Sequence, residues 1–195
     1  MPCYHPITAY RGATGGKITF TEGGDSGPAL SLPCGRCIGC RLHRTQEWAT
    51  RCMNEAQMHD ANSFVTLTYN DNHYTPGLEY EHFQRFIRAL RRTGQKVRYF
   101  AAGEYGEENN RPHWHALLFG VHFNNLYPVG ANLYSSPELE QLWTHGFTSI
   151  GEVNQQTANY VASYCIKKAT GPHAAIRYAR VDINTGEIFQ VKPEM

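Results

Sequence analysis

Two histidines separated by one residue, His113 and His115, are the side chains best suited to bind a metal ion in this sequence. In an extended strand, residues i and i+2 point to the same face of a sheet. Both imidazoles are therefore predicted to leave one face together, close enough to bind one cation. Trp114, Ala116 and Leu118 alternate with them and are predicted to be buried on the opposite face.

A carboxylate at the end of the preceding predicted strand is the candidate third ligand. Glu104 follows the strand predicted over 97–102, and an antiparallel hairpin would bring it beside His113. Glu107 and Glu108, in the polar turn, are competing carboxylates. Two histidines and one carboxylate leave coordination positions open for a substrate, and they suit Mn²⁺ or Mg²⁺ better than a closed zinc cage.

Two tyrosines four residues apart are the candidate nucleophiles. Tyr160 and Tyr164 fall on one face of a helix predicted over 155–168, and Lys167 and Lys168 lie one turn further along, placed to balance charge on a phosphate. A tyrosine hydroxyl has an ordinary pKa of about 10, so its attack on phosphorus needs a cation, a lysine or a positioned base. Amphipathic packing is the competing interpretation, because the chain has 12 tyrosines.

A run of cysteines near the N-terminus is typical of a metal site. Adjacent Cys-x-x-Cys pairs in a chain without an export signal favour a metal over disulfides, and a structural zinc needs four ligands. The predicted ligands are Cys3, Cys34, Cys37 and Cys40. His5 and His43 compete with Cys3 for the fourth position, and free thiols or an iron–sulfur cluster are the other interpretations. Cys52 and Cys165 are predicted to pack in helices as small apolar residues.

The composition fits one substantial domain with a small appendage. The chain is 41% hydrophobic with a net charge of +1, so its overall charge does not indicate a nucleic-acid partner. Two local basic groups, over 36–51 and 85–98, become plausible contacts to DNA phosphates beside a phosphate-chemistry site. No apolar run approaches the length of a membrane span and no signal pattern opens the chain, so we expect a cytoplasmic protein without a membrane partner.

The pattern of predicted elements is typical of an α+β domain. Helices are expected over 41–59, 79–92, 137–143 and 155–168, and strands over 7–10, 17–21, 64–69, 97–102, 113–119 and 147–150, with a loop over 23–28 and a terminal hairpin over 175–191. We predict a central, mostly antiparallel sheet with flanking helices over 41–195. Residues 1–40 are expected to form a cysteine-rich β cap that is stabilised by zinc and packed on this domain.

Three short segments, in this order, resemble the motif set of the HUH superfamily of rolling-circle replication initiators. The segments are Phe64–Asn70, Pro112–His115 and Tyr160–Lys168. The paired tyrosines with the double lysine resemble the two-tyrosine branch found in small single-stranded DNA phages. The cysteine run followed by a basic helix is similar to the replication initiators of gokushovirus-type microviruses. The resemblance covers roughly residues 1–190.

The resemblance implies a metal-dependent, site-specific nickase and ligase of single-stranded DNA. Such enzymes stay joined to the 5′ end of the cut strand through phosphotyrosine, and the second tyrosine permits the rejoining that ends rolling-circle replication. The residues to which these roles carry over are the metal ligands His113, His115 and Glu104, the nucleophiles Tyr160 and Tyr164, and the helix lysines Lys167 and Lys168. The implied partners are a DNA origin and a host helicase or polymerase, in the bacterial cytoplasm. Tyr69 and Tyr105 are candidates for stacking bases.

Two other functions fit parts of the sequence. A metal-dependent hydrolase would use the two histidines and Glu104 as ligands and the tyrosines for packing alone. A non-enzymatic, zinc-containing DNA-binding module would use the cysteine run and the basic helix over 41–59. A covalent protein–DNA adduct is expected from the nickase and from neither alternative.

Overall fold

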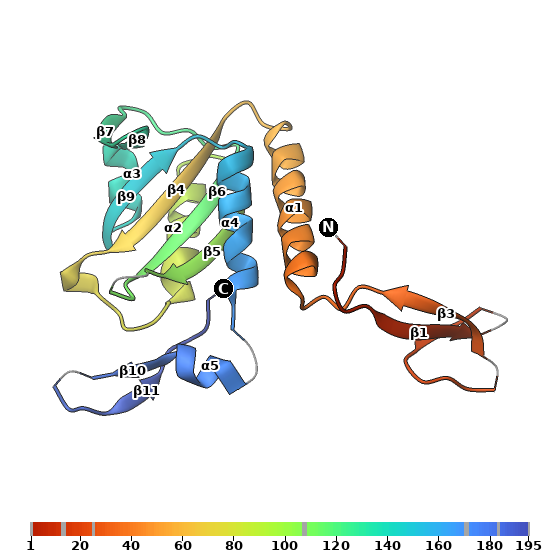
Figure 1. Ribbon diagram of the computed structural model, residues 1–195. Coiled ribbons are helices and arrows are strands. Elements are labelled where there is room, and N and C mark those ends of the chain that lie inside the picture. The colour runs from red at the N-terminus through yellow and green to blue at the C-terminus, as the bar shows by residue number, and fades with distance from the viewer. Residues whose placement is uncertain are drawn as a thin grey trace. The chain divides into compact units, whose positions relative to one another are not determined.

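The computed structural model describes residues 2–12, 15–24, 26–106, 109–169, 172–182 and 184–194, with Cys165 and Pro172 described by their backbone alone. The chain divides into two compact units, residues 1–47 and 48–195. The predicted α+β class with a central antiparallel sheet is confirmed (Figure 1). No helix in the described ranges is long and apolar enough to cross a membrane.

The first unit contains a three-stranded antiparallel sheet in the order β2-β1-β3. Its strands are β1 (Ile7–Gly12), β2 (Ile18–Thr19) and β3 (Ser26–Leu32). The loop predicted over 23–28 is wrong in its second half, since β3 begins at Ser26. A register shift between Tyr10 and Gly12 accommodates the Gly27–Pro28 pair, which made this segment resemble a loop.

The second unit is built on a six-stranded sheet in the order β5-β6-β4-β9-β8-β7, in which neighbouring strands run antiparallel. The strands are β4 (Asn62–Tyr69), β5 (Arg98–Tyr105), β6 (Pro112–Phe119), β7 (Tyr127–Gly130), β8 (Leu133–Ser135) and β9 (Gly146–Gly151). The β5–β6 hairpin was predicted, although β5 extends further than expected and includes Glu104. Strands β7 and β8 were not predicted, because they are short and mostly exposed.

One face of this sheet packs against α2 (Tyr80–Arg92) and α3 (Pro137–Leu142). The predicted apolar stripe of α2 is buried there, and so are Trp114, Ala116 and Leu118 of β6, as their alternation predicted. The N-terminus of α3 is capped by Ser136, whose hydroxyl accepts a hydrogen bond from the Leu139 N–H at 3.1 Å. This face forms the larger hydrophobic core.

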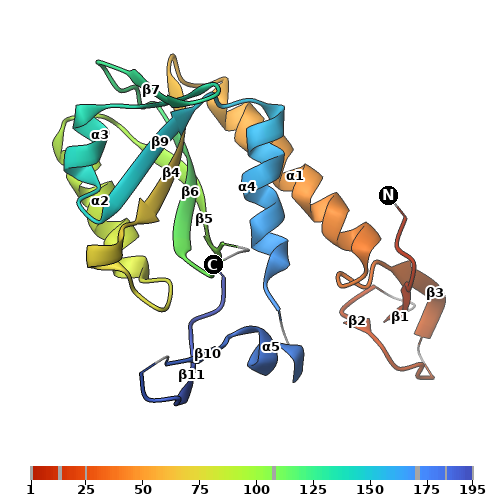
Figure 2. The same cartoon turned by 60° about the vertical axis from the view of Figure 1, so that its left-hand side comes forward.

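The opposite face packs against α4 (Gln155–Lys167), and Figures 1 and 2 both show α4 on the side of the sheet away from α2. Residues 48–56, the C-terminal end of α1 (Ile38–Ala56), contribute to the same core, where Cys52 is buried as predicted. A capping box between Asn154 and Thr157 starts α4 at a defined residue, which fixes where its later residues meet the sheet. Gly171, predicted to close this helix, lies outside the described residues.

Three further elements complete the second unit. A short 3₁₀ helix, η1 (Asp71–His73), follows β4. The predicted terminal hairpin is present as β10 (Ala179–Val181) and β11 (Ile188–Gln190), with Gly186 in its turn at φ 72°. The preceding α5 (Pro172–Arg177) was not predicted, because six residues are too few to show a helical period.

Candidate active site and cysteine cluster

Strand β6 presents His113 and His115 to the face of the sheet that α4 covers, with ring centroids 5.9 Å apart. Glu104 of β5 is paired directly with His113, and paired residues of neighbouring strands share a face. Its Oε1 atom lies 2.7 Å from His115 Nε2 and 3.8 Å from His113 Nε2. One carboxylate oxygen therefore lies between the two imidazoles. The competing Glu107 and Glu108 lie outside the described residues.

Both ring nitrogens of His115 have partners. Its Nδ1 lies 3.0 Å from the Thr66 hydroxyl, while its Nε2 faces Glu104. The side chain is 4% exposed, so these two contacts fix its orientation away from water. Burial, and then the neighbouring His115, lower the pKa of His113. This shift favours the neutral imidazole that a metal ion requires.

Helix α4 places both candidate tyrosines against His115. The Tyr164 ring stacks on the imidazole, with centroids 5.2 Å apart and planes 11° apart, and the Tyr160 ring meets it edge-on at 5.1 Å. Tyr160 is 43% exposed and Tyr164 only 5%. Burial, then the Tyr160 hydroxyl and the Glu104 carboxylate, raise the pKa of Tyr164. The two hydroxyls therefore differ in their access to solvent.

The two lysines that follow the tyrosines are placed differently. Lys167 Nζ lies 4.3 Å from the centre of the Tyr164 ring, in a cation–π contact. Lys168 is the C-cap residue of α4 and is exposed. The structure thus gathers the two histidines, Glu104, both tyrosines and Lys167 in one place, from segments up to 63 residues apart, Glu104 to Lys167.

The sequence interpretation missed one aromatic residue on this face. Phe147 of β9 is opposite Thr68 of β4, which is itself opposite His113, so all three lie in one row across the sheet. Phe147 is 67% exposed, and two strand spacings place it about 10 Å from His113. The strand that carries Phe147 was predicted, but only the order of the strands in the sheet shows that Phe147 lies in the same row as His113.

The residues predicted to stack bases are placed elsewhere. Tyr69 is 0% exposed in the core on the α2 side, so its predicted stacking role is wrong. Alternation along β4 turns it away from the histidine face. Trp114 is buried in the same core, as expected. The Tyr105 hydroxyl donates to the Lys192 carbonyl at 2.6 Å and accepts from the Leu78 N–H at 3.0 Å.

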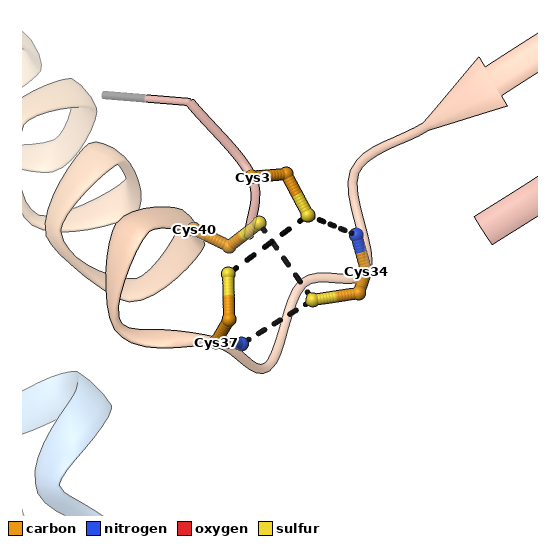
Figure 3. A group of neighbouring side chains, drawn as sticks. All are labelled: Cys3, Cys34, Cys37 and Cys40. Atoms are coloured by element: carbon orange, nitrogen blue, oxygen red, sulfur yellow. Dashed lines mark hydrogen bonds between the residues drawn. The ribbon is translucent and has the colours of Figure 1, made fainter. Parts of the chain in front are cut away.

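The four predicted cysteines of the first unit point toward one another (Figure 3), and their sulfur atoms all lie within 4.8 Å. Cys34 Sγ lies 4.0 Å from Cys40 Sγ, and Cys37 Sγ lies 3.8 Å from Cys3 Sγ. Cys3, rather than His5 or His43, completes the group, and this cluster could hold a metal ion.

Backbone N–H groups point at the sulfur atoms of this cluster. Those of Cys34 and Cys37 each donate to a cysteine sulfur at 3.3 Å (Figure 3). The N–H groups of Cys40 and Tyr4 lower the pKa of Cys37 to about 6, whereas burial raises the pKa of Cys40 to about 12. Donated N–H groups stabilise thiolates, the form in which cysteine binds metals.

Comparison with known proteins identifies a family and three relatives. A family model described as replication-associated protein ORF2/G2P matches residues 62–169, which contain the histidines, Glu104 and both tyrosines. The chain is 36% identical over 185 residues to replication-associated protein VP4 of Bdellovibrio phage phiMH2K, covering 86% of this chain and 58% of the relative. It is 31% identical over 196 residues to replication-associated protein ORF2 of Spiroplasma virus 4, covering 86% and 61%.

A third relative, replication-associated protein ORF4 of Chlamydia phage 1, is 32% identical over 156 residues, covering 72% of this chain and 39% of the relative. The chain therefore spans about two fifths to three fifths of the length of these curated relatives. No solved structure gives a significant match. The kinship with phage replication proteins that the three segments predicted is confirmed, and the chain belongs to the replication-associated protein ORF2/G2P family.

Proposed function

We propose that this chain is a nickase and ligase of single-stranded DNA, of the two-tyrosine HUH type, that starts and ends rolling-circle replication. The observation that carries the proposal is the contact of both α4 tyrosines with His115, whose Nε2 lies 2.7 Å from Glu104. A hydrolase would have no use for two phenols at this position. The names of the relatives, all replication-associated proteins, support a role at a DNA origin.

The donor set fits a divalent cation of the Mn²⁺ or Mg²⁺ type. The oxygen of Glu104 lies 2.7 and 3.8 Å from the two Nε2 atoms, near the separation of about 3 Å between adjacent ligands of an octahedral ion. The three ligand atoms are not all within 4.8 Å of one another, so binding of an ion would draw the two imidazoles together. We assign His113, His115 and Glu104 as its ligands, with the remaining positions open to substrate. The bound ion would polarise a phosphate oxygen and make the phosphorus more electrophilic.

The proposed reaction exchanges one diester for another. The tyrosine oxygen forms a bond to phosphorus while the bond from phosphorus to the 3′ oxygen breaks, which gives a 5′-phosphotyrosine and a free 3′ hydroxyl. The phenolic proton is balanced by the proton gained on the leaving oxygen. Because a diester is retained, a later attack by a 3′ hydroxyl rejoins the strand without ATP. The lysines Lys167 and Lys168 would balance phosphate charge from the end of α4.

Exposure distinguishes the two nucleophiles. Tyr160 is 43% exposed and open to an incoming strand, whereas Tyr164 is 5% exposed and lies beneath Tyr160, with ring centroids 4.8 Å apart. We therefore assign the first attack to Tyr160. Once Tyr160 is joined to DNA and drawn toward the phosphate, Tyr164 is freed for the second attack.

The test is a covalent adduct on a denaturing gel. Single-stranded oligonucleotides that tile the DNA around the gene, labelled at the 3′ end, are incubated with the protein and Mn²⁺. A labelled protein band is expected, and it should disappear with EDTA and in the Tyr160→Phe, Tyr164→Phe double variant. Tyr134→Phe is the matched control, because Tyr134 is also 43% exposed but lies in β8. Cleavage at full rate by the double variant would refute the nucleophile assignment and favour a hydrolase.

For the cysteine cluster we propose a structural zinc held by Cys3, Cys34, Cys37 and Cys40. A tetrahedral ion with bonds of about 2.3 Å to sulfur separates its ligands by about 3.8 Å. The two sulfur–sulfur distances of 3.8 and 4.0 Å match this value. Elemental analysis of the purified protein should find one zinc per chain, and iron in its place would contradict the assignment.

A further inference from the structure

A basic groove lies on the face of the sheet that does not carry the histidines. It is a cavity of about 450 Å³ between α2 and residues 141–145. The α2 wall carries Arg85, Arg88 and Arg92, all exposed, whose spacing of three and four residues places them along one side of the helix. The opposite wall carries polar groups of Gln141, Thr144 and His145. We call this site the arginine groove.

The charge of the groove is largely uncompensated. Arg85 forms an ion pair with Glu81 at 2.7 Å. Within the described ranges no carboxylate lies within ion-pairing distance of Arg88 or Arg92, and no acidic side chain lines the cavity. Its two imidazoles, His82 and His145, stack 4.1 Å apart. Burial lowers the pKa of both, that of His145 to about 4, so near neutral pH they offer N–H donors and the charge comes from the arginines.

This chemistry matches a row of phosphates better than a protein partner. Guanidinium groups bind phosphate oxygens in pairs. From Arg85 to Arg92 the helix rises about 10.5 Å, so the three guanidinium groups can contact successive phosphates of one strand. The aromatic residues of the groove, Phe86 and Trp143, are each 1% exposed and so provide no anchor for a protein side chain.

The groove and the active site open at the same end of the sheet. Just after β4, the Asn70 N–H donates a hydrogen bond to the His145 carbonyl at 3.0 Å. Two residues earlier in the chain, Thr68 is opposite His113. A DNA strand that leaves the histidine face across this end of the sheet would therefore reach His145 and then the arginines of α2.

We propose that the arginine groove binds the phosphate backbone of the DNA segment that flanks the nick. The inference rests on the proposed function for the identity of the nucleic acid, and it adds a second contact region outside the catalytic face. It accounts for Arg85, Arg88 and Arg92 of the basic group over 85–98, which the reaction itself does not use. The groove would hold the strand while the tyrosines exchange it, without reading its sequence.

The test compares two double variants that remove equal charge. The groove variant, Arg88→Gln with Arg92→Gln, removes two positive charges from the groove. The control variant, Arg91→Gln with Lys96→Gln, removes two exposed charges that do not line it. Binding of fluorescent single strands of about 30 nucleotides is measured against salt concentration. The groove variant should lower the slope of log affinity against log salt by about 1.4, since each single-strand phosphate contact contributes about 0.7. The control should change the slope by less than half as much.

Further outcomes separate this inference from the proposed function. Adduct formation on a six-nucleotide strand that spans only the nick should be unchanged in the groove variant. If adducts form but the two double variants have equal slopes, the groove inference is refuted and the proposed function stands. If the slope falls as expected but no adduct forms, the groove binds DNA and the proposed function fails. Binding of a poly-glutamate peptide with the same dependence on Arg88 and Arg92, and none for DNA, would assign the groove to an acidic protein segment and overturn the inference.

Discussion

Replacing Thr66 by valine removes one hydroxyl and keeps the β-branched shape that the strand favours. That hydroxyl lies 3.0 Å from His115 Nδ1, and His115 is 4% exposed, so water cannot replace it. Leaving a buried polar group without its partner costs about 1–3 kcal/mol, or about 5- to 150-fold in an equilibrium constant. We expect this loss in the affinity of the histidine site for Mn²⁺.

Calorimetric titration of Mn²⁺ is the assay, with adduct formation measured at low and at saturating Mn²⁺. Adduct formation should fall at low Mn²⁺ and recover near saturation, because Thr66 orients a ligand and touches no reacting atom. Thr68→Val is the matched control: Thr68 faces the same side, opposite His113, and its hydroxyl forms no hydrogen bond to that ring in the described part of the chain. Equal Mn²⁺ affinities for the two variants would show that the Thr66 hydroxyl does not orient His115 for the metal.

Three further predictions follow from the exposure of single side chains and from the cysteine cluster. Tyr160→Phe should lower the first-turnover yield of adduct at least tenfold, whereas Tyr164→Phe should permit nicking but block rejoining. Gels of quenched-flow samples measure both effects, and the reverse pattern would exchange the roles of the two tyrosines. Phe147→Ala should weaken the binding of single-stranded DNA by about 1–3 kcal/mol, because base stacking is lost. The melting temperature of the protein should not change, because Phe147 is 67% exposed. Unchanged DNA binding, measured by fluorescence anisotropy, would exclude the stacking role. Removal of zinc by a chelator should unfold residues 1–47, because the buried hydrophobic core of their described part is essentially Ala9. Limited proteolysis should then cut this unit first. Full resistance to the protease after chelation would contradict a structural metal.

The elements of the active site could be predicted because their signals are local. The period of two in His113–Phe119 and the spacing of Tyr160 and Tyr164 each identify one face of one element. The β5–β6 hairpin also brings Glu104 beside His113 through adjacent segments. The caps that the structure shows at Ser136 and Asn154 are likewise contacts between neighbours in sequence.

What the sequence did not reveal depends on contacts between distant segments. Phe147 becomes a neighbour of the histidine row only because β9 pairs with β4, about 80 residues earlier in the chain. The hydroxyl of Thr66 could not be assigned to His115 before β4 was known to lie beside β6. The arginine groove likewise needs α2 to lie near residues 141–145. Periodicity assigns a residue to a face, but it does not state which strand lies next to it.

The most direct test of the account is to locate the bond between protein and DNA. After reaction with a single-stranded substrate and Mn²⁺, protease and nuclease digestion followed by tandem mass spectrometry identifies the modified side chain. We expect a nucleotide joined through phosphate to Tyr160, with Tyr164 modified in the Tyr160→Phe variant. Cleaved DNA with both tyrosines unmodified, or a nucleotide joined to a residue outside α4, would contradict it.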